Sequence, residues 1–258
     1  MCRHLAYLGP PAPLAALLFD PPHSLAHQSW APREMRGGGT INADGFGVGW
    51  YAEHAEPGTG ADGDAIRYRR HTPIWSDPTL PGLAAHVSSG AVLAAVRSAT
   101  VGMPVVETAA APFGEGRWLF SHNGVVAGWP SSLAKLAGTL PVDDLLTLPA
   151  PTDAALLWVL VRDRLRAGVP PATAVAGVIA EVERAAPGSR LNLLLTDGVT
   201  IVATALGHSL SYISDFSVNT VVVASEPLDD RPAWRPVPDR TLLTATASDL
   251  TLTPLGEA

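Results

Sequence analysis

The sequence predicts an α+β protein in which helices and sheets pack in layers. Strand-like segments come first, two helical segments lie in the middle, and strand-like segments return at the end. The strict βαβ alternation of a doubly wound parallel sheet is absent from this pattern. With 258 residues, 47% of them hydrophobic, the chain can form one large domain or two small ones with a real core.

The first half is expected to be mostly strands. Residues 2–8 read as a short apolar strand, and the glycines that alternate with apolar residues at 44–51 indicate a strand packed against another backbone. The acidic, glycine-rich segment 53–64 is expected to be an exposed hairpin tip, and the glycines at 37–39 a hinge or tight turn. Further elements expected here are short helices at 14–19 and 80–88 and strands at 66–71, 91–96 and 118–121.

The second half is expected to begin with helices and to end with strands. Residues 153–167 have apolar side chains at helical spacing, with Thr152 or Asp153 as the start and Gly168 as the end. A second helix is expected at 171–186, before a Pro-Gly pair. The strands expected after it are 191–196, 200–205, 220–224 and 241–245.

Composition excludes several classes of function. The formal net charge is -7, and the few Lys and Arg residues are scattered, so neither a nucleic-acid partner nor an anionic membrane surface is indicated. The apolar stretches are strand-sized, and Arg3 and His4 stand where a secretory signal would begin. We therefore expect a cytoplasmic protein that needs no protein partner. No cofactor is implied, and no His/Asp/Glu cluster has the spacing of metal ligands.

Cys2 is the only cysteine of the chain. It can form neither an internal disulfide nor a cysteine-based metal site, so it is either an incidental small residue or a nucleophile. Methionine is normally trimmed before a small residue, and removal of Met1 leaves a thiol and a free α-amine on one residue. An α-amine has a pKa of about 8 and can act as general base for the thiol. The histidines have no Asp or Asn partner at a telling spacing, which disfavours a papain-like enzyme.

Five other residues suit acyl transfer from a γ-glutamyl amide. The Asn123 side chain and the Gly124 N–H can form an oxyanion hole, although Asn-Gly is also typical of a hairpin turn. Arg97 follows an apolar strand and can hold an α-carboxylate with help from Thr100; a surface ion pair is the alternative. Asp153 can hold the α-ammonium, or it can simply cap a helix.

Together these segments resemble the class II glutamine amidotransferase family. The likeness covers about the first 155 residues, with two later strands that also fit, and it implies the Ntn-hydrolase fold, a four-layer αββα sandwich of two mainly antiparallel sheets. The motifs that carry it, in the family's order, are Met1-Cys2-Arg3, Asp44-Gly45-Phe46-Gly47, Arg97-Ser98-Ala99-Thr100-Val101-Gly102, Ser121-His122-Asn123-Gly124 and Thr152-Asp153.

The resemblance also implies a role for each matching residue. Cys2 is then the nucleophile, and Asn123 with Gly124 is the oxyanion hole. The residues implied to bind the glutamyl half of the substrate are Arg97, Thr100, His122 and Asp153.

The residues after Cys2 depart from the family's usual Gly-Ile, because Arg3-His4 follows here. In this respect the chain is similar to a stand-alone branch of the family. We therefore expect a single domain at 2–258 with no synthase domain. Segments 28–33, 42–51 and 224–228, with Trp234, are similar to the ergothioneine-pathway hydrolases, which implies cleavage of γ-glutamyl-hercynylcysteine sulfoxide into glutamate and hercynylcysteine sulfoxide. A glutaminase subunit or a glutathione-degrading Dug-type amidotransferase with a separate partner is the alternative, and a binding protein without catalysis is a third reading.

The sequence does not locate the pocket for the leaving half of that substrate. Four tryptophans are candidates for stacking on an imidazole or a cationic betaine, and each is equally well explained as a core or rim residue. These candidates are Trp30, Trp50, Trp75 and Trp129.

Overall fold

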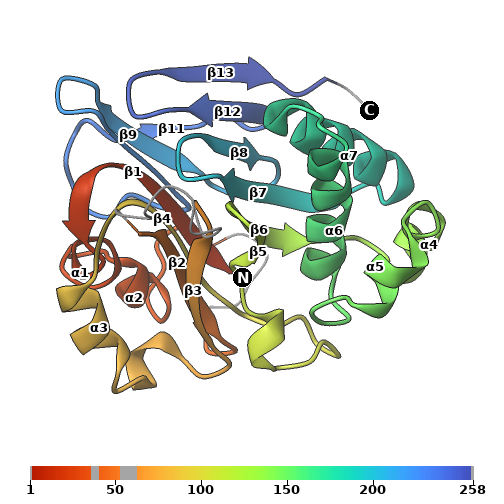
Figure 1. Cartoon of the computed structure of the whole chain (residues 1–258), viewed down its shortest axis with the longest axis horizontal. Helices are drawn as coiled ribbons and strands as arrows, with labels where there is room; N and C mark the ends of the chain where they lie inside the picture. The colour runs from red at the N-terminus through yellow and green to blue at the C-terminus, as the bar shows by residue number, and fades with distance from the viewer. Residues whose placement is uncertain (1, 36–40, 53–62, 257–258) are drawn as a thin grey trace.

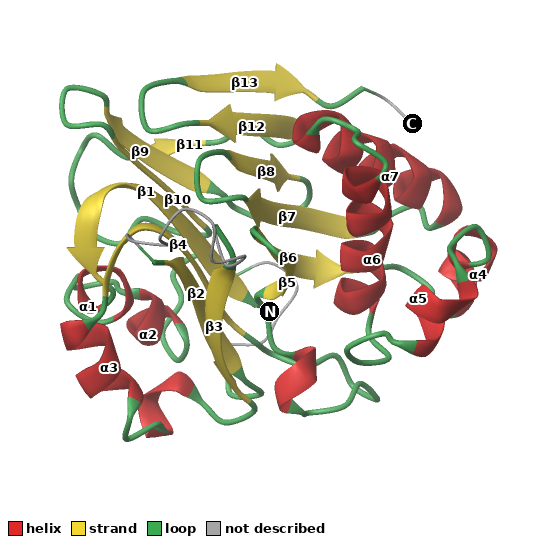
Figure 2. Cartoon of the chain, viewed as in Figure 1, coloured by secondary structure: helices red, strands yellow, loops and turns green. Residues whose placement is uncertain are grey.

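The protein is described by a computed structural model that covers residues 2–35, 41–52 and 63–256 (Figure 1). Two sheets pack face to face, and helices cover the outer face of each one (Figure 2). The α+β class and the αββα layering are therefore confirmed. The glycines at 37–39 and most of the expected hairpin tip at 53–64 lie outside the described residues.

The first sheet has seven strands in the order β11-β9-β10-β1-β4-β2-β3, and all of its pairs are antiparallel. The N-terminal strand is its centre, because β1 pairs with both β4 and β10. Its strands are β1 (Arg3–Pro13), β2 (Phe46–Tyr51), β3 (Ala65–Arg70), β4 (Ser88–Val96), β9 (Ser211–Asp215), β10 (Thr220–Ala224) and β11 (Arg235–Pro236).

The second sheet has six antiparallel strands in the order β13-β12-β8-β7-β6-β5. Strand β6 lies beside β7 near the middle, and this pair carries several of the candidate site residues. Its strands are β5 (Phe113–Glu115), β6 (Trp118–Val125), β7 (Arg190–Thr196), β8 (Ile201–Ala205), β12 (Thr241–Ala245) and β13 (Leu250–Pro254).

The helices divide between the two outer faces (Figure 2). Short helices cover the seven-stranded sheet, and the long helices α6 and α7 cover the six-stranded sheet. Thr152 begins α6, since its hydroxyl accepts a hydrogen bond from the N–H of Ala155 at 3.2 Å. The α-helices are α1 (Ala15–Leu18), α2 (Leu25–Gln28), α3 (Leu80–His86), α4 (Ala134–Ala137), α5 (Val142–Leu146), α6 (Asp153–Arg166) and α7 (Pro171–Ala185), and the 3-10 turns are η1 (Ile74–Ser76), η2 (Glu107–Ala109) and η3 (Ser131–Leu133).

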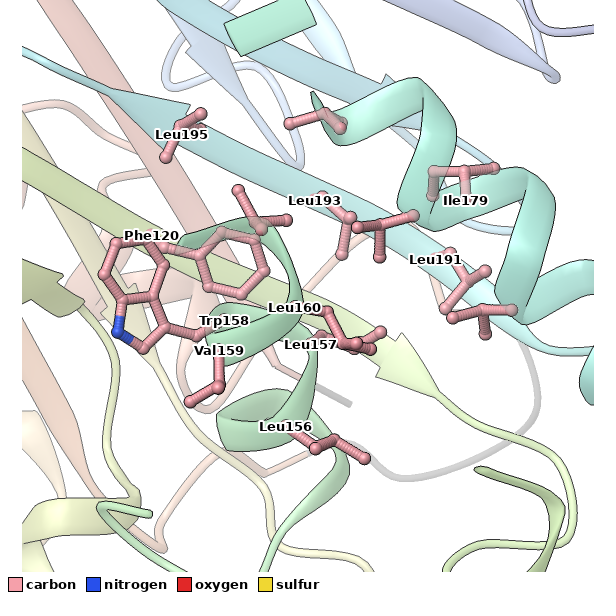
Figure 3. Close-up of a cluster of buried hydrophobic side chains, with 14 of the residues drawn as sticks. Phe120, Leu156, Leu157, Trp158, Val159, Leu160, Ile179, Leu191, Leu193 and Leu195 are labelled. Atoms are coloured by element: carbon pink, nitrogen blue, oxygen red, sulfur yellow. The ribbon is translucent and has the colours of Figure 1, made fainter. Parts of the chain in front are cut away.

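Three apolar clusters hold the four layers together. Side chains alternate across β1, so Leu5 packs against the short helices while Ala6 packs against the other sheet. The third cluster lies between the six-stranded sheet and α6 and α7, where Phe120 meets Trp158 at a ring-centroid distance of 5.7 Å (Figure 3). Because both sheets are covered on both faces, their central strands are apolar on both sides.

The structure corrects the turn reading of Asn123-Gly124. Both residues lie within β6, where Asn123 pairs with Asn192 and Gly124 pairs with Leu191 of β7. A Cβ on Gly124 would meet the Arg190 carbonyl oxygen, so glycine is needed here for close approach between strands. The short strands β5, β9, β11 and β13 have no counterpart among the predicted elements.

Candidate active site

Cys2 lies immediately before β1, at the mouth of the interface between the two sheets. The β1–β4 ladder begins at the pair Arg3 and Val96, which places Cys2 beside Arg97. The Cys2 thiol lies 3.7 Å from the carbonyl oxygen of Ser98 and is partly buried. Met1 lies outside the described residues, so its expected removal is not tested.

A small cavity joins Cys2 to two other predicted site residues. Cys2, Arg97 and His122 all line it, together with Ser121 and Ala154, and its volume is about 30 Å³. That volume holds one or two water molecules. The fold therefore brings a thiol just before β1, a guanidinium just after β4 and an imidazole in β6 to one cavity.

Arg97 is a buried cation without a carboxylate partner among the described residues. Its side chain is 8% exposed, and Nη1 donates to the carbonyl oxygens of Asp44 at 3.4 Å and of Pro104 at 3.0 Å. The segment that follows Arg97 is held in place, because the Asp44 carboxylate accepts the N–H of Ala99 at 2.8 Å. A buried charge that lacks a counter-ion is costly, so this site favours an anionic ligand. The surface ion pair considered for Arg97 is not formed within the described chain.

Asp153 is a buried carboxylate at the start of α6. Its Oδ2 accepts the N–H of Val126 at 3.0 Å, and its Oδ1 accepts the N–H of Ala154 at 2.8 Å. The helix-capping role considered for Asp153 belongs to Thr152 instead. These bonds tie the end of β6 to α6 and fix the carboxylate close to the cavity wall formed by Ala154.

Thr100 is not in the cavity of Cys2. It is exposed and lines a second, larger cavity of about 580 Å³, together with Pro104 and Val126. Arg97 donates to the Pro104 carbonyl oxygen and Asp153 accepts from the Val126 N–H, so each of these charged residues contacts one residue that lines the larger cavity. Of the residues predicted to bind the glutamyl half, Arg97 and His122 thus line the small cavity, Thr100 lines the larger one, and Asp153 lines neither.

Asn123 and His122 are held by neighbouring backbone and side chains. Asn123 is fully buried, its Nδ2 donates to Ser225 Oγ at a long 3.4 Å, and its Oδ1 has no hydrogen-bond partner among the described residues. His122 Nε2 lies 3.0 Å from the Arg190 carbonyl oxygen, which can only accept, so Nε2 carries a proton. Ser225 Oγ also accepts the N–H of His4 at 3.0 Å, so one hydroxyl links β1 to the predicted oxyanion residue.

A buried ion network beside Cys2 was missed by sequence reasoning. Arg3 Nε donates to Glu226 Oε1 at 2.7 Å, and His23 Nε2 lies 2.6 Å from Glu226 Oε2. Burial opposes ionisation of Glu226, but the hydrogen bond from His23, the N–H groups of Arg33 and Glu34 and the charge of Arg3 outweigh it and lower its pKa to about 2. The signal available in the sequence was the charged Arg3 directly after Cys2.

Arg3 in turn fixes the backbone of Cys2. Its Nη1 donates to the Cys2 carbonyl oxygen at 3.0 Å, and its Nη2 donates to the Glu34 carbonyl oxygen at 2.5 Å. The neighbouring His4 is fully buried, and burial, followed by the charges of His122, Arg3 and His208, lowers its pKa to about 3. A neutral His4 therefore lies beneath the site, with Nδ1 3.2 Å from Ser121 Oγ.

No group of three or more His, Cys, Asp or Glu residues in the part of the chain that the structure describes could hold a metal ion. Within the same residues, every helix is too short or too polar to cross a membrane.

Comparison with known proteins places these observations in a family. The family model described as glutamine amidotransferases class-II matches residues 12–217. Gamma-glutamyl-hercynylcysteine sulfoxide hydrolase of Mycolicibacterium smegmatis is 40% identical over 255 residues, which are 99% of this chain and 100% of that protein. The protein of the same name from Mycobacterium tuberculosis is 38% identical over 258 residues, 100% of this chain and 98% of that protein. Probable glutamine amidotransferase DUG3 of Saccharomyces cerevisiae is 28% identical and covers 99% of this chain and 84% of its own length.

Solved structures give the same result at the level of fold. A glutamine aminotransferase class-II domain protein from Silicibacter pomeroyi has a TM-score of 0.68 and 27% identity, and covers 99% of this chain and 100% of its own. The glutamine phosphoribosylpyrophosphate amidotransferase of B. subtilis has a TM-score of 0.65 at 12% identity, and covers 99% of this chain and 49% of its own. The chain belongs to the class II glutamine amidotransferases and is an amidohydrolase of that family.

Proposed function

We propose that the protein hydrolyses a γ-glutamyl amide with Cys2 as the nucleophile. One observation carries this proposal: the Cys2 thiol shares a cavity with Arg97, a buried cation that has no carboxylate partner in the described chain. A nucleophile next to an unpaired cation suits an acyl donor that carries a carboxylate. Removal of Met1 is part of the proposal, because the free amine of Cys2 is the base.

The proposed reaction has two halves. The Cys2 thiolate attacks the γ-carbonyl carbon, and the Asn123 amide and the Gly124 N–H receive the oxyanion. Only one Nδ2 hydrogen of Asn123 is used by Ser225, so the second is available. The Cys2 ammonium gives its proton to the departing amine, and a γ-glutamyl thioester remains. Water, which loses its proton to the same amine, then cleaves the thioester to glutamate and free Cys2.

The glutamyl half is proposed to bind at Arg97 and Asp153, which contact Pro104 and Val126 of the larger cavity. Arg97 holds the α-carboxylate and Asp153 holds the α-ammonium, while the γ-carbonyl reaches Cys2. Thr100 contributes from the larger cavity, where the α-end of the substrate has room. His122 presents its ring to the small cavity and is proposed to contact the glutamyl chain.

The substrate is proposed to be γ-glutamyl-hercynylcysteine sulfoxide, with glutamate and hercynylcysteine sulfoxide as products. Two relatives of that name match almost the whole chain at 38% and 40% identity, whereas DUG3 matches at 28%. We propose residues 2–258 as one catalytic domain that works in the cytoplasm without a protein partner.

The test combines intact-protein mass spectrometry with a glutamate-release assay. The assay compares γ-glutamyl-hercynylcysteine sulfoxide, glutathione and glutamine. Loss of Met1 and a strong preference for the first substrate are expected. Faster glutamate release from glutathione or glutamine, stimulated by a second protein, would overturn the proposed substrate and leave the proposed mechanism intact. Active protein that retains Met1 would overturn the base assigned here.

A further inference from the structure

A third opening lies on the side of Glu34, and Arg3 links its rim to the backbone of Cys2. This Glu34 groove has a volume of about 300 Å³. Within the described chain it shares no lining residue with the two cavities of the glutamyl site. Its lining residues are Glu34, His208, Ser209, Leu210, Ser211, Pro227, Trp234, Arg235, Pro236 and Val237.

Two short connections join this groove to the reacting atoms. Arg3 donates from one guanidinium to the carbonyl oxygens of both Cys2 and Glu34, so the rim of the groove is one side chain from the nucleophile. On the other wall, Asn192 Nδ2 donates to the carbonyl oxygens of His208 and Ser209 at 3.2 and 3.1 Å. Asn192 is the cross-strand partner of Asn123, the proposed oxyanion residue. These contacts connect the walls of the groove to the backbone of Cys2 and to the proposed oxyanion residue.

Glu34 presents an unused carboxylate from a fixed backbone. Its N–H donates to Glu226 Oε1 at 3.0 Å, and its carbonyl oxygen accepts from Arg3. Its own side chain is exposed and makes no hydrogen bond or ion pair with the residues that the structure describes. An anchored backbone with a free carboxylate is suited to a cationic ligand.

Trp234 and Arg235 complete the chemistry of the groove. The Trp234 indole is half-buried, and its Nε1 donates to Asp229 Oδ1 at 2.9 Å, which fixes the ring. Arg235 is exposed and has no ion pair within the described chain. His208 adds no charge, because burial and the nearby charges of Arg190 and Arg3 lower its pKa to about 3. One groove thus offers an anion, an aromatic ring and a cation.

We propose that the Glu34 groove binds the leaving half of the substrate and selects a zwitterion, with its quaternary ammonium at Glu34 and Trp234 and its carboxylate at Arg235. This inference rests on the proposed function. A trimethylammonium group donates no hydrogen bonds, so it is recognised by a negative charge and by an aromatic face. Hercynylcysteine sulfoxide carries such a group next to a carboxylate, whereas the ammonia released from glutamine carries neither.

The four tryptophans singled out in the sequence are less suited to this role. Trp50 is buried in the core under the short helices. Trp30 and Trp75 are each 45% exposed and meet each other edge to face at 5.8 Å. Trp129 lines the larger cavity with Thr100, on the glutamyl side.

The test compares two substrates that share the glutamyl half. One is γ-glutamyl-hercynylcysteine sulfoxide, and the other is γ-glutamyl-p-nitroanilide, whose leaving group is uncharged. For Glu34→Gln and for Trp234→Leu we expect kcat/KM on the first to fall about tenfold, chiefly through KM, and kcat/KM on the second to change less than about twofold. Arg235→Gln is also expected to lower kcat/KM on the first substrate and to leave kcat/KM on the second nearly unchanged.

Matched controls remove a charge elsewhere on the surface. Asp143 on α5 and Arg184 on α7 are exposed, and Asp143→Asn and Arg184→Gln are expected to leave kcat/KM unchanged on both substrates. Circular dichroism and thermal unfolding check that each variant is folded.

The outcomes separate this inference from the proposed function. Selective loss on the zwitterionic substrate supports the groove. Equal rates for wild type, Glu34→Gln and Trp234→Leu on that substrate would overturn the groove and leave the proposed function intact. Wild-type protein that cleaves only the nitroanilide would overturn the proposed substrate, and the groove assignment with it.

Discussion

Replacement of Arg97 by Ala tests the glutamyl-binding half of the site. Only 8% of the side chain is exposed, and its guanidinium has two carbonyl oxygens and no carboxylate as partners in the described chain. Truncation of one partner in a desolvated charge pair costs about 2–5 kcal/mol of binding. The long 3.4 Å bond to Asp44 and the adjoining larger cavity indicate partial hydration, so we expect about 2–3 kcal/mol, or roughly 30- to 150-fold in kcat/KM.

The assay is glutamate release from γ-glutamyl-hercynylcysteine sulfoxide and from γ-glutamyl-p-nitroanilide. Both substrates should lose the same factor in kcat/KM, because Arg97 is proposed to bind the glutamyl half that they share. Arg97→Lys should lose less than Arg97→Ala, since it keeps the charge and lacks the planar pair of donors. The two lost carbonyl bonds should lower the free energy of unfolding by about 1–2 kcal/mol. An unchanged KM on both substrates, in a folded variant, would refute the assignment of Arg97.

Four further predictions concern Cys2, the buried ion network, the contact of Gly124 with the neighbouring strand, and the pH dependence of stability. Cys2→Ala should abolish glutamate release and leave the thermal midpoint nearly unchanged; measurable turnover would contradict the mechanism. Glu226→Gln leaves the charge of buried Arg3 uncompensated and should lower the free energy of unfolding by about 3–5 kcal/mol in urea titrations, and a loss below about 1 kcal/mol would count against the network. Gly124→Ala should cost about 1–3 kcal/mol by the same measurement, because its Cβ meets the Arg190 carbonyl oxygen; a neutral change would show that the strands can separate. In the folded protein the pKa of Glu226 is about 2 and that of His4 is about 3, below their ordinary values of 4.5 and 6.5. The unfolded chain therefore binds more protons than the folded chain between pH 6.5 and pH 2, and the free energy of unfolding should fall as the pH drops through this range. A flat profile of urea midpoints between pH 7 and pH 4 would contradict this.

Much of the glutamyl site could be predicted from the sequence. Cys2 and Arg97 carry chemistry in their side-chain type, and the structure places both on one small cavity. Asp153 stands at the start of α6 as expected, although Thr152 provides the cap. The catalytic and binding roles of these residues stay predictions, because only their positions are observed.

The parts that the sequence did not reveal depend on contacts between distant segments. Glu226 lies 223 residues from Arg3, and no spacing or periodicity indicates that the two form a buried pair. Asn123-Gly124 has the local composition of a turn, but pairing with β7 keeps both residues in a strand. The Glu34 groove likewise joins a loop before β2 to β9 and β11.

The sequence by itself determined the α+β class, the long helices α6 and α7, most of the central strands and the residues able to do the chemistry. These follow from hydrophobic periodicity and side-chain type, which are local properties. Only the tertiary structure decided which polar groups are buried together, which cavity each site residue lines and where a leaving group can go. Those features arise when the two sheets pack face to face, because burial then pairs the charges of segments far apart in the chain.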